Sequence, residues 1–88
     1  MNTVSDKVQW VYVLLERHHS APGAWLDRRI SAFATLELAQ AQAEQYAEAR
    51  GELIQEWNRE RQYLHEVRFE GTTGGDYSYV MAGLELHA

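Results

Sequence analysis

The sequence predicts an α+β fold in which one four-stranded, mainly antiparallel sheet packs on one long amphipathic helix. Three observations lead to this fold class: a β-branched and aromatic run near the start, a single helical phase in the middle, and a glycine-rich turn between two apolar runs near the end. The elements therefore follow in the order strand, strand, helix, strand, strand. Because 88 residues support only one hydrophobic core, we expect a single domain over residues 1–88, with residues 1–7 flexible.

The first strand is expected at Val8 to Leu15, where the run VQWVYVLL is rich in β-branched and aromatic residues. Both parities of this run are apolar, as in a strand that is covered on both faces. The segment Glu16 to Arg28 holds the only proline and has the composition of a loop. A weaker second strand follows at about residues 29–34, where broken alternation indicates a β-bulge.

The middle of the chain predicts one long helix from Leu36 to about Arg61. Its apolar residues share one arc of a helical wheel: Leu36, Ala39, Ala43, Tyr46, Ala47, Leu53, Ile54 and Trp57. Thr35 precedes this run and suits the N-cap position. Gly51 is the obvious place for a break, but the apolar phase continues beyond it. We therefore expect an unbroken helix of roughly 22 to 25 residues.

The last third predicts a β-hairpin, with strands at Tyr63 to Glu70 and Tyr77 to Leu86 joined by the glycine-rich loop 71–76. Its register is expected to pair Glu70 with Tyr77 across this loop. That register places a mostly apolar set of side chains on one face: Tyr63, His65, Val67, Phe69, Ser78, Val80, Ala82 and Leu84.

The opposite, aromatic face of the sheet is the expected interaction surface. It collects six residues that would lie away from the helix: Trp10, Tyr12, Leu14, Tyr77, Tyr79 and Met81. Because a single helix covers only one face of a sheet, this side would lack an intramolecular cover. Aromatic surfaces of this kind meet other protein chains. The sequence thus predicts protein binding here, either to a second copy in a homodimer or to a different protein.

The composition limits the classes of partner. A formal charge of -5 argues against direct binding of nucleic acid and favours partners with a basic surface. The chain has no cysteine, which is compatible with a reducing cytoplasm. No apolar run approaches the ~20 residues that a membrane span requires. We therefore expect a cytoplasmic protein that does not bind membranes.

Five glutamates recur every four residues on the far side of the predicted helix: Glu44, Glu48, Glu52, Glu56 and Glu60. Carboxylates one helical turn apart are spaced by about 6 Å, near the phosphate spacing along a nucleic-acid strand. One reading is therefore a nucleic-acid mimic that inhibits a host defence complex, of the restriction or CRISPR kind. A solvated helix face explains the same pattern more simply.

No motif predicts catalysis, a cofactor or a metal ion. His18 and His19 are adjacent, so their side chains point apart in an extended chain and lack metal-ligand spacing. The run Gly71 to Gly75 lacks the helix and the lysine that complete a phosphate-binding loop. Arg50 lies within the apolar stripe and is expected to reach a carboxylate at the sheet edge, with a ligand anion as the alternative. The sequence predicts a non-enzymatic protein, and small-ligand binding is the alternative.

Four features carry a resemblance to known proteins: V-Y-V-L from Val11 to Leu14, F-A-T followed by spaced alanines from Phe33 to Ala43, Trp57, and Tyr-x-x-x-x-x-x-L-E-L ending at Leu86. In these the chain resembles small uncharacterised proteins of phages and bacterial accessory genomes. The resemblance implies a strand-strand-helix-strand-strand fold and a mobile-element setting, without an activity. By analogy with small acidic proteins from that setting, the protein would act by occluding a partner protein.

Overall fold

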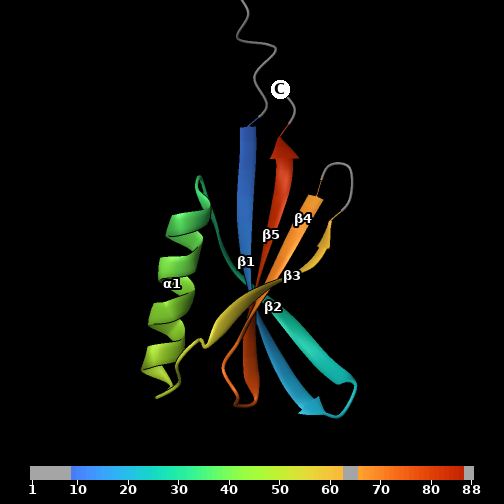
Figure 1. Cartoon of the computed structure of the whole chain (residues 1–88), viewed down its shortest axis with the longest axis vertical. Helices are drawn as coiled ribbons and strands as arrows, with labels where there is room; N and C mark the ends of the chain where they lie inside the picture. Colours follow the sequence, from blue (N-terminus) through green and yellow to red (C-terminus); the bar gives the residue numbers. More distant parts are fainter. Residues whose placement is uncertain (1–8, 63–65, 87–88) are drawn as a thin grey trace, which may run out of the picture.

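The computed structural model describes residues 9–62 and 66–86. Its elements are β1 (Gln9–Ala21), β2 (Ala24–Phe33), α1 (Leu36–Ala49), β3 (Glu56–Gln62), β4 (Glu66–Thr72) and β5 (Tyr77–Leu86). All five strands form one antiparallel sheet in the order β2-β1-β5-β4-β3, and α1 lies along one side of it (Figure 1). The expected four-stranded sheet on a long helix is therefore wrong. Residues 1–7, which were expected to be flexible, lie outside the described residues. Tyr63 and His65, which were expected on the apolar face of the C-terminal hairpin, also lie outside them.

The helix ends at Ala49 because Gly51 reverses the direction of the backbone. Gly51 adopts a φ of 75°, in the left-handed region that favours glycine. Its N–H donates to Glu48 O at 2.9 Å, and the Glu52 N–H donates to Ala47 O at 2.9 Å, which is the hydrogen-bond pattern of a Schellman cap. The prediction of an unbroken helix through Gly51 is wrong, since the apolar residues beyond it belong to a loop and to β3.

The start of the helix agrees with the sequence analysis. Thr35 is the N-cap residue, and its hydroxyl accepts a hydrogen bond from the Leu38 N–H at 3.2 Å. The helix then runs for 14 residues, from Leu36 to Ala49. In residues 9–62 and 66–86, no helix has the length and apolar character needed to cross a membrane.

The segment Glu16 to Arg28, predicted as a loop, forms most of a long β-hairpin. Pro22 and Gly23 make its turn, where Gly23 has a φ of 73°. Opposite charges face each other across the two strands, since Glu16 pairs with Arg28 and Arg17 pairs with Asp27. These cross-strand pairs stabilise a strand despite its polar composition.

The predicted irregularity in the second strand is present. Leu14 pairs with Ser31 and Leu15 pairs with Arg29, which leaves Ile30 as an extra residue in β2. Ile30 packs against the core instead of following the alternation of its neighbours. The bulge therefore turns an apolar side chain toward the helix.

The C-terminal hairpin forms, but in a different register from the predicted one. Thr72 pairs with Ser78, and Glu70 pairs with Val80 instead of Tyr77. The turn is tighter because the Thr73 hydroxyl donates to Tyr77 O at 2.6 Å and accepts from the Gly75 N–H at 3.1 Å. The pairing moves by an odd number of residues, so β4 side chains change the β5 neighbours with which they share a face.

The core lies between α1 and the aromatic face of the sheet. Three helix alanines, Ala39, Ala43 and Ala47, are fully buried against large sheet side chains. The small alanine side chains let the helix approach closely, and the space is filled by Leu14, Tyr79 and Met81. Phe69 of β4 joins this face as a consequence of the observed register. The helix therefore covers the face that the sequence analysis expected to be open.

Candidate functional site: the hairpin arm and the open face of the sheet

The six residues of the predicted interface lie on the helix side of the sheet. Leu14, Tyr79 and Met81 are 0% exposed and belong to the core. Tyr12 packs against this core, and the Tyr77 ring lies under the Arg50 guanidinium. Trp10 lines a hollow at one end of the sheet. The expectation that this face lacks an intramolecular cover is wrong, because α1 packs on the side of the sheet that carries the larger side chains.

The face turned away from α1, which we call the open face, carries a narrow apolar strip along its two central strands. The strip is formed by Val13, Leu15, Ala82 and Leu84, and Leu84 is 40% exposed. Charged residues flank it on both sides, with Asp27 and Arg29 from β2 and with Glu66 and Arg68 from β4. Together these eight residues line a shallow hollow of about 470 Å³. The open face thus offers apolar contact area between two charged rims.

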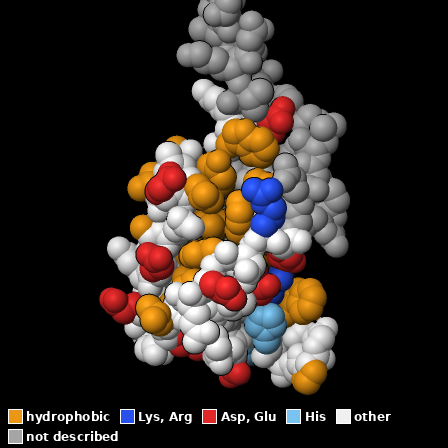
Figure 2. Space-filling model, viewed as in Figure 1, with side chains coloured by type: hydrophobic (Ala, Val, Ile, Leu, Met, Phe, Trp, Pro, Cys, Tyr) orange, Lys and Arg blue, Asp and Glu red, His pale blue; other side chains and the backbone are white. Residues whose placement is uncertain are grey.

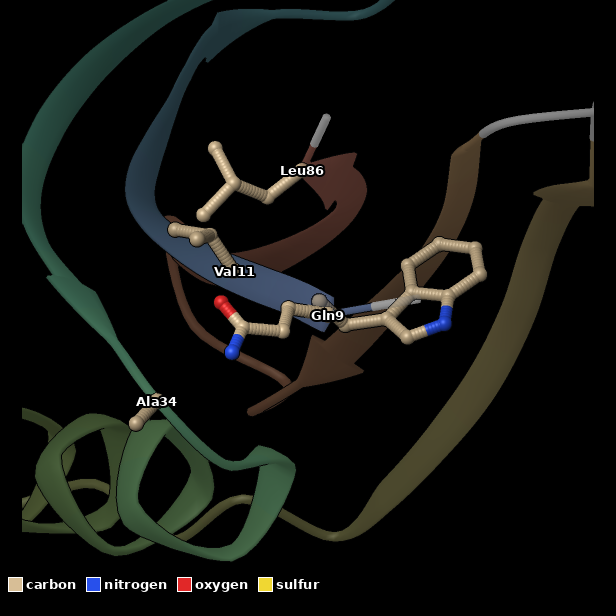
Figure 3. Close-up of a pocket in the computed structure, with 5 residues that line it drawn as sticks. Gln9, Val11, Ala34 and Leu86 are labelled. Carbon is tan, nitrogen blue, oxygen red and sulfur yellow. The ribbon is translucent and has the colours of Figure 1, made fainter. Parts of the chain in front are cut away.

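A second hollow of about 440 Å³ lies at the end of the sheet where β1 starts and β5 ends. Its lining residues are Gln9, Trp10, Val11, Ala34 and Leu86. In Figure 3 the Val11 and Leu86 side chains extend from neighbouring strands, and Ala34 lies across from them beside the start of the helix. Val11 of this hollow is the cross-strand neighbour of Leu84, which lines the first hollow.

Arg17 is the centre of a buried ion-pair network on the open face. Its side chain is 6% exposed, and its Nε and Nη2 donate to the two carboxylate oxygens of Asp27 at 2.8 and 3.1 Å. Glu60 and Glu70 lie 3.6 and 3.8 Å from Nη1. The hydrogen bonds to Asp27 outweigh the effect of burial and raise the pKa of Arg17, so the guanidinium stays charged.

His19, Ser78 and Glu70 lie next to this network but do not form a catalytic triad. The Ser78 hydroxyl donates to Glu70 Oε2 at 2.6 Å and lies 2.9 Å from His19 Nε2. In a triad the carboxylate orients the histidine, whereas here it binds the serine directly. Ser78 is also only 3% exposed, so a substrate has no access to its hydroxyl. The three residues tie β1, β4 and β5 together.

A second ion-pair network lies on the helix side and joins the hairpin to the end of α1. Glu16 accepts hydrogen bonds from Arg50 Nη2 at 2.6 Å and from Arg28 Nη2 at 3.0 Å. Burial opposes ionisation of this carboxyl, but the two guanidinium groups outweigh it and hold its pKa below the ordinary value. Arg50 also stacks on Tyr77, 3.6 Å from the ring centroid. Arg50 reaches a carboxylate of the sheet as expected, but Glu16 lies on β1, between β2 and β5, and not at the sheet edge.

The two adjacent histidines point to opposite faces of the sheet, as the sequence predicts. His18 stacks on Tyr77 with ring centroids 4.7 Å apart, on the helix side. His19 contacts Ser78 on the open face. Within residues 9–62 and 66–86, no group of three or more histidine and carboxylate side chains is arranged to hold a metal ion.

The tip of the β1–β2 hairpin projects beyond β5, and we call its residues 20–26 the hairpin arm. The His19 N–H donates to Asp76 O at 2.8 Å, and the arm extends beyond this bond. The tip of the hairpin lies at the lower right of Figure 1. All seven arm residues are exposed and none carries a charge. Trp25 is 53% exposed and Leu26 is 74% exposed. The Trp25 ring is held from one side by Arg17, whose guanidinium carbon lies 4.8 Å from the ring centroid.

The five predicted glutamates do not share a helix face. Glu44 and Glu48 are exposed on α1, whereas Glu52 follows the helix and is partly buried. Glu56 and Glu60 belong to β3, and Glu60 takes part in the Arg17 network. Figure 2 shows acidic side chains over the helix side of the molecule and hydrophobic side chains between the helix and the strands. The acidic surface is therefore discontinuous.

The sequence analysis missed the residues that build the arm and its support: Arg17, Trp25, Leu26, Asp27 and Arg28. A signal for them is present in the sequence. Glu16-Arg17 and Asp27-Arg28 lie on either side of a Pro-Gly turn, and antiparallel pairing sets each base against an acid. Counting cross-strand charge pairs around the turn would have predicted the long hairpin.

The chain gave no significant match when compared with models of known families, with curated proteins and with solved structures.

Proposed function

We propose that this protein acts without catalysis by binding another protein, and that the hairpin arm makes the central contact. The observation that carries the proposal is the exposure of two large apolar side chains, Trp25 and Leu26, on an uncharged projecting tip. Tryptophan is among the residues that most often dominate binding energy in protein interfaces. A projecting, uncharged tip with this side chain suits insertion into an apolar site on a partner.

The arm is prepared for binding by its own support. Arg17 holds one side of the Trp25 ring, and Asp27 fixes the Arg17 side chain with two hydrogen bonds. A side chain that is already ordered loses less conformational entropy when it binds. Adjacent residues of a strand point to opposite faces, so Trp25 and Leu26 make both faces of the arm apolar. A partner with a cleft would contact both side chains, whereas a flat surface would contact one.

The polar clusters support a binding function over hydrolysis. The one serine, histidine and carboxylate cluster considered above has a buried hydroxyl and the wrong order of hydrogen bonds. Both ion-pair networks connect the arm to the sheet and to the end of α1, which is a positioning role. Small-ligand binding near Arg50 has less support, because that guanidinium is already engaged by Glu16 and Tyr77.

Nucleic-acid mimicry through Glu44, Glu48, Glu52, Glu56 and Glu60 is the weaker alternative. The mimic requires a regular line of exposed carboxylates, and these five are divided between a helix, a loop and a strand. A partner with a basic surface would contact the outer side of α1, which carries glutamates and has no basic residue in its last turn. The resemblance to proteins of mobile elements adds two expectations to the proposal: a mobile-element setting, and action by occluding a partner protein.

Self-association also belongs to the proposal, since the sequence predicts a homodimer. The aromatic face predicted for it is occupied by α1. A homodimer therefore has to use another surface of the chain.

The proposed role of the arm is tested with leucine variants matched in exposure. Immobilised protein and its Trp25→Ala, Leu26→Ser and Leu53→Ser variants would be used to capture proteins from an extract of the source cells, and the affinity of each captured protein would then be measured by calorimetry. For a partner that binds the arm, we expect Trp25→Ala to raise the dissociation constant by more than about tenfold, as truncation of a hot-spot residue does. Leu53 is 75% exposed and distant in sequence from the arm, so Leu53→Ser should bind like the unmodified chain. Equal affinities for all four proteins would contradict the proposal.

A further inference from the structure

We propose that the open face is the self-association surface, and that a second copy of this chain covers its apolar strip face to face about a two-fold axis. The inference rests on the self-association proposed above and names the surface that performs it. The strip runs along β1 and β5 through Val13, Leu15, Ala82 and Leu84. In the described part of the chain, α1 is the one helix, and it lies on the other side of the sheet.

The charges beside the strip can complement those of a second copy of the same patch. On β4 the open face carries Glu66, Arg68 and Glu70 in turn, and on β2 it carries Asp27 and Arg29. A two-fold interface presents the same patch on both copies, so the patch must complement itself. If the strands of the second copy are reversed about a two-fold axis that passes between Glu66 and Arg68, Arg68 of each copy lies opposite Glu66 of the other. The alternation therefore suits this kind of symmetry.

The same charges disfavour a strongly basic partner at this position. The lining of the hollow has two acids and two bases, so it is neutral although the whole chain carries a formal charge of -5. A basic protein would be steered to the acidic outer side of α1 instead. The neutral, self-complementary hollow fits a second copy better than a partner of opposite charge.

The size of the patch limits the strength of this association. The four strands that line the hollow, spaced by about 4.8 Å and paired over about seven residues at ~3.3 Å per residue, make a patch of about 440 Å². Standard protein interfaces bury about 800 Å² on each partner, so a patch of this size suits a weak dimer. Val80 and Ala82 at the centre are already buried by neighbouring side chains, so the new apolar contact comes mainly from Val13, Leu15 and Leu84. We therefore expect a dissociation constant in the micromolar range.

Dimerisation through the strip would leave the arm available. The arm projects beyond the end of β5, while the hollow is lined by residues of the middle and far end of this strand. A dimer centred on the hollow would then carry two arms. Two arms on one particle raise the apparent affinity for a partner that is itself repeated.

The surface is tested by sedimentation equilibrium of the full chain and two leucine variants. Leu84→Lys places a charge in the strip, and Leu38→Lys places the same charge on α1 at a leucine that is 54% exposed. We expect Leu84→Lys to raise the dissociation constant by more than about tenfold, since a buried charge without a partner opposes association, and Leu38→Lys to leave it unchanged. Circular dichroism would confirm that each variant keeps the fold.

A charge exchange on the β4 rim provides a second variant that does not depend on an inserted lysine. Arg68→Glu should weaken the dimer because the rim then carries only acids, and the double variant Glu66→Arg with Arg68→Glu should restore it because positions 66 and 68 again carry opposite charges. The Arg68 side chain forms an ion pair with Glu66 at 2.9 Å, and the double variant keeps this pair. Failure of the double variant to restore the dimer would contradict the self-complementary arrangement.

The outcomes separate the surface from self-association itself. An unmodified chain that remains monomeric at high micromolar concentration would overturn both. A dimer with equal dissociation constants for the unmodified chain and Leu84→Lys would overturn the open face alone. Trp25→Ala should leave the dimer intact under this inference, so loss of the dimer in that variant would show that the arm, and not the strip, holds the copies together.

Discussion

At the scale of single residues, the hairpin depends on two arginine-carboxylate networks on opposite faces. Arg17 makes the network of the open face, and Glu16 makes the network of the helix side. Both side chains are only 6% exposed, although they lie in a segment whose composition predicts a loop. A buried charge is tolerated only when its partners satisfy it, so each network makes a specific prediction about stability.

Arg17→Met removes the base that three carboxylates share. We expect a loss of roughly 2 to 4 kcal/mol in the free energy of unfolding, somewhat less than for a fully buried pair because the carboxylates keep contact with water. Urea denaturation followed by circular dichroism measures this change. Arg28→Met is the matched control, since the Arg28 side chain is 68% exposed and should contribute less than about 1 kcal/mol. Equal losses for the two variants would contradict the central role of Arg17.

Glu16→Gln should change the dependence of stability on pH. The pKa of Glu16 is lower in the folded protein than its ordinary value of 4.5, because its arginine partners outweigh burial. A carboxylate of this kind stabilises the fold above its unfolded pKa, and the contribution is lost as pH falls through the folded pKa. The unmodified chain should therefore be more stable than Glu16→Gln at neutral pH, and the difference should shrink below pH 4.5. Thermal denaturation across this range measures it, and a difference that grows on acidification would contradict the assignment.

At the scale of elements, Gly51 decides where the helix ends. Because its φ is 75°, a side chain at this position is strained even though the space around it is open. Gly51→Ala should destabilise the protein by about 1 kcal/mol, and Gly51→Asn by less, since asparagine tolerates this conformation better. Urea denaturation of both variants compares them. A gain in stability for Gly51→Ala would indicate a helix that continues through this position.

The packing of α1 on the sheet is tested by two alanines of the same helix. Ala43 is 0% exposed in the core, whereas Ala41 is exposed. Ala43→Leu should cost about 1 to 3 kcal/mol because the helix is displaced from the sheet, and Ala41→Leu should change stability little. Chemical denaturation distinguishes the two. An equal response would mean that the alanine stripe does not face the sheet.

Some elements follow from the sequence because local chemistry determines them. Thr35 caps the helix and a bulge interrupts the second strand, both as predicted, and Arg50 reaches a sheet carboxylate, although not at the sheet edge. The end of the helix was missed because an apolar phase continued by chance across Gly51 into a loop and a strand. The first hairpin was missed because composition alone does not show that Glu16 and Arg17 are satisfied by residues on the returning strand.

At the scale of the whole molecule, the side of the sheet that the helix covers could not be read from single strands. Both parities of β1 are apolar, so the choice depends on the combined volumes of several strands and of α1. The helix offers alanines, and the face with Leu14, Tyr79 and Met81 supplies the larger side chains that fill the space. The register error in the C-terminal hairpin concealed this match, because it separated Phe69 from Tyr79 and Met81.

The sequence predicts one sheet face without a helix, but it assigns that face to the wrong side of the sheet. The sequence indicates a two-sided sheet with one helix, and therefore one face without a helix. In the structure the helix covers the face that was expected to be open, and the opposite face has no helix. The structure also shows the arm, whose exposure depends on how far β1 and β2 extend beyond β5. The side that the helix covers and the projection of the arm both depend on how distant strands pair, so neither can be read from a local stretch of sequence.

The central claim is that the helix covers the aromatic face and leaves the Val13 and Leu84 face free for association. Methyl-labelled protein, followed by nuclear magnetic resonance from low micromolar to millimolar concentration, tests this most directly. We predict concentration-dependent shifts for the methyl groups of Val13, Leu15 and Leu84, with little change at Leu38 on the helix. Shifts confined to Leu38, or unchanged spectra over the whole concentration range, would contradict the claim.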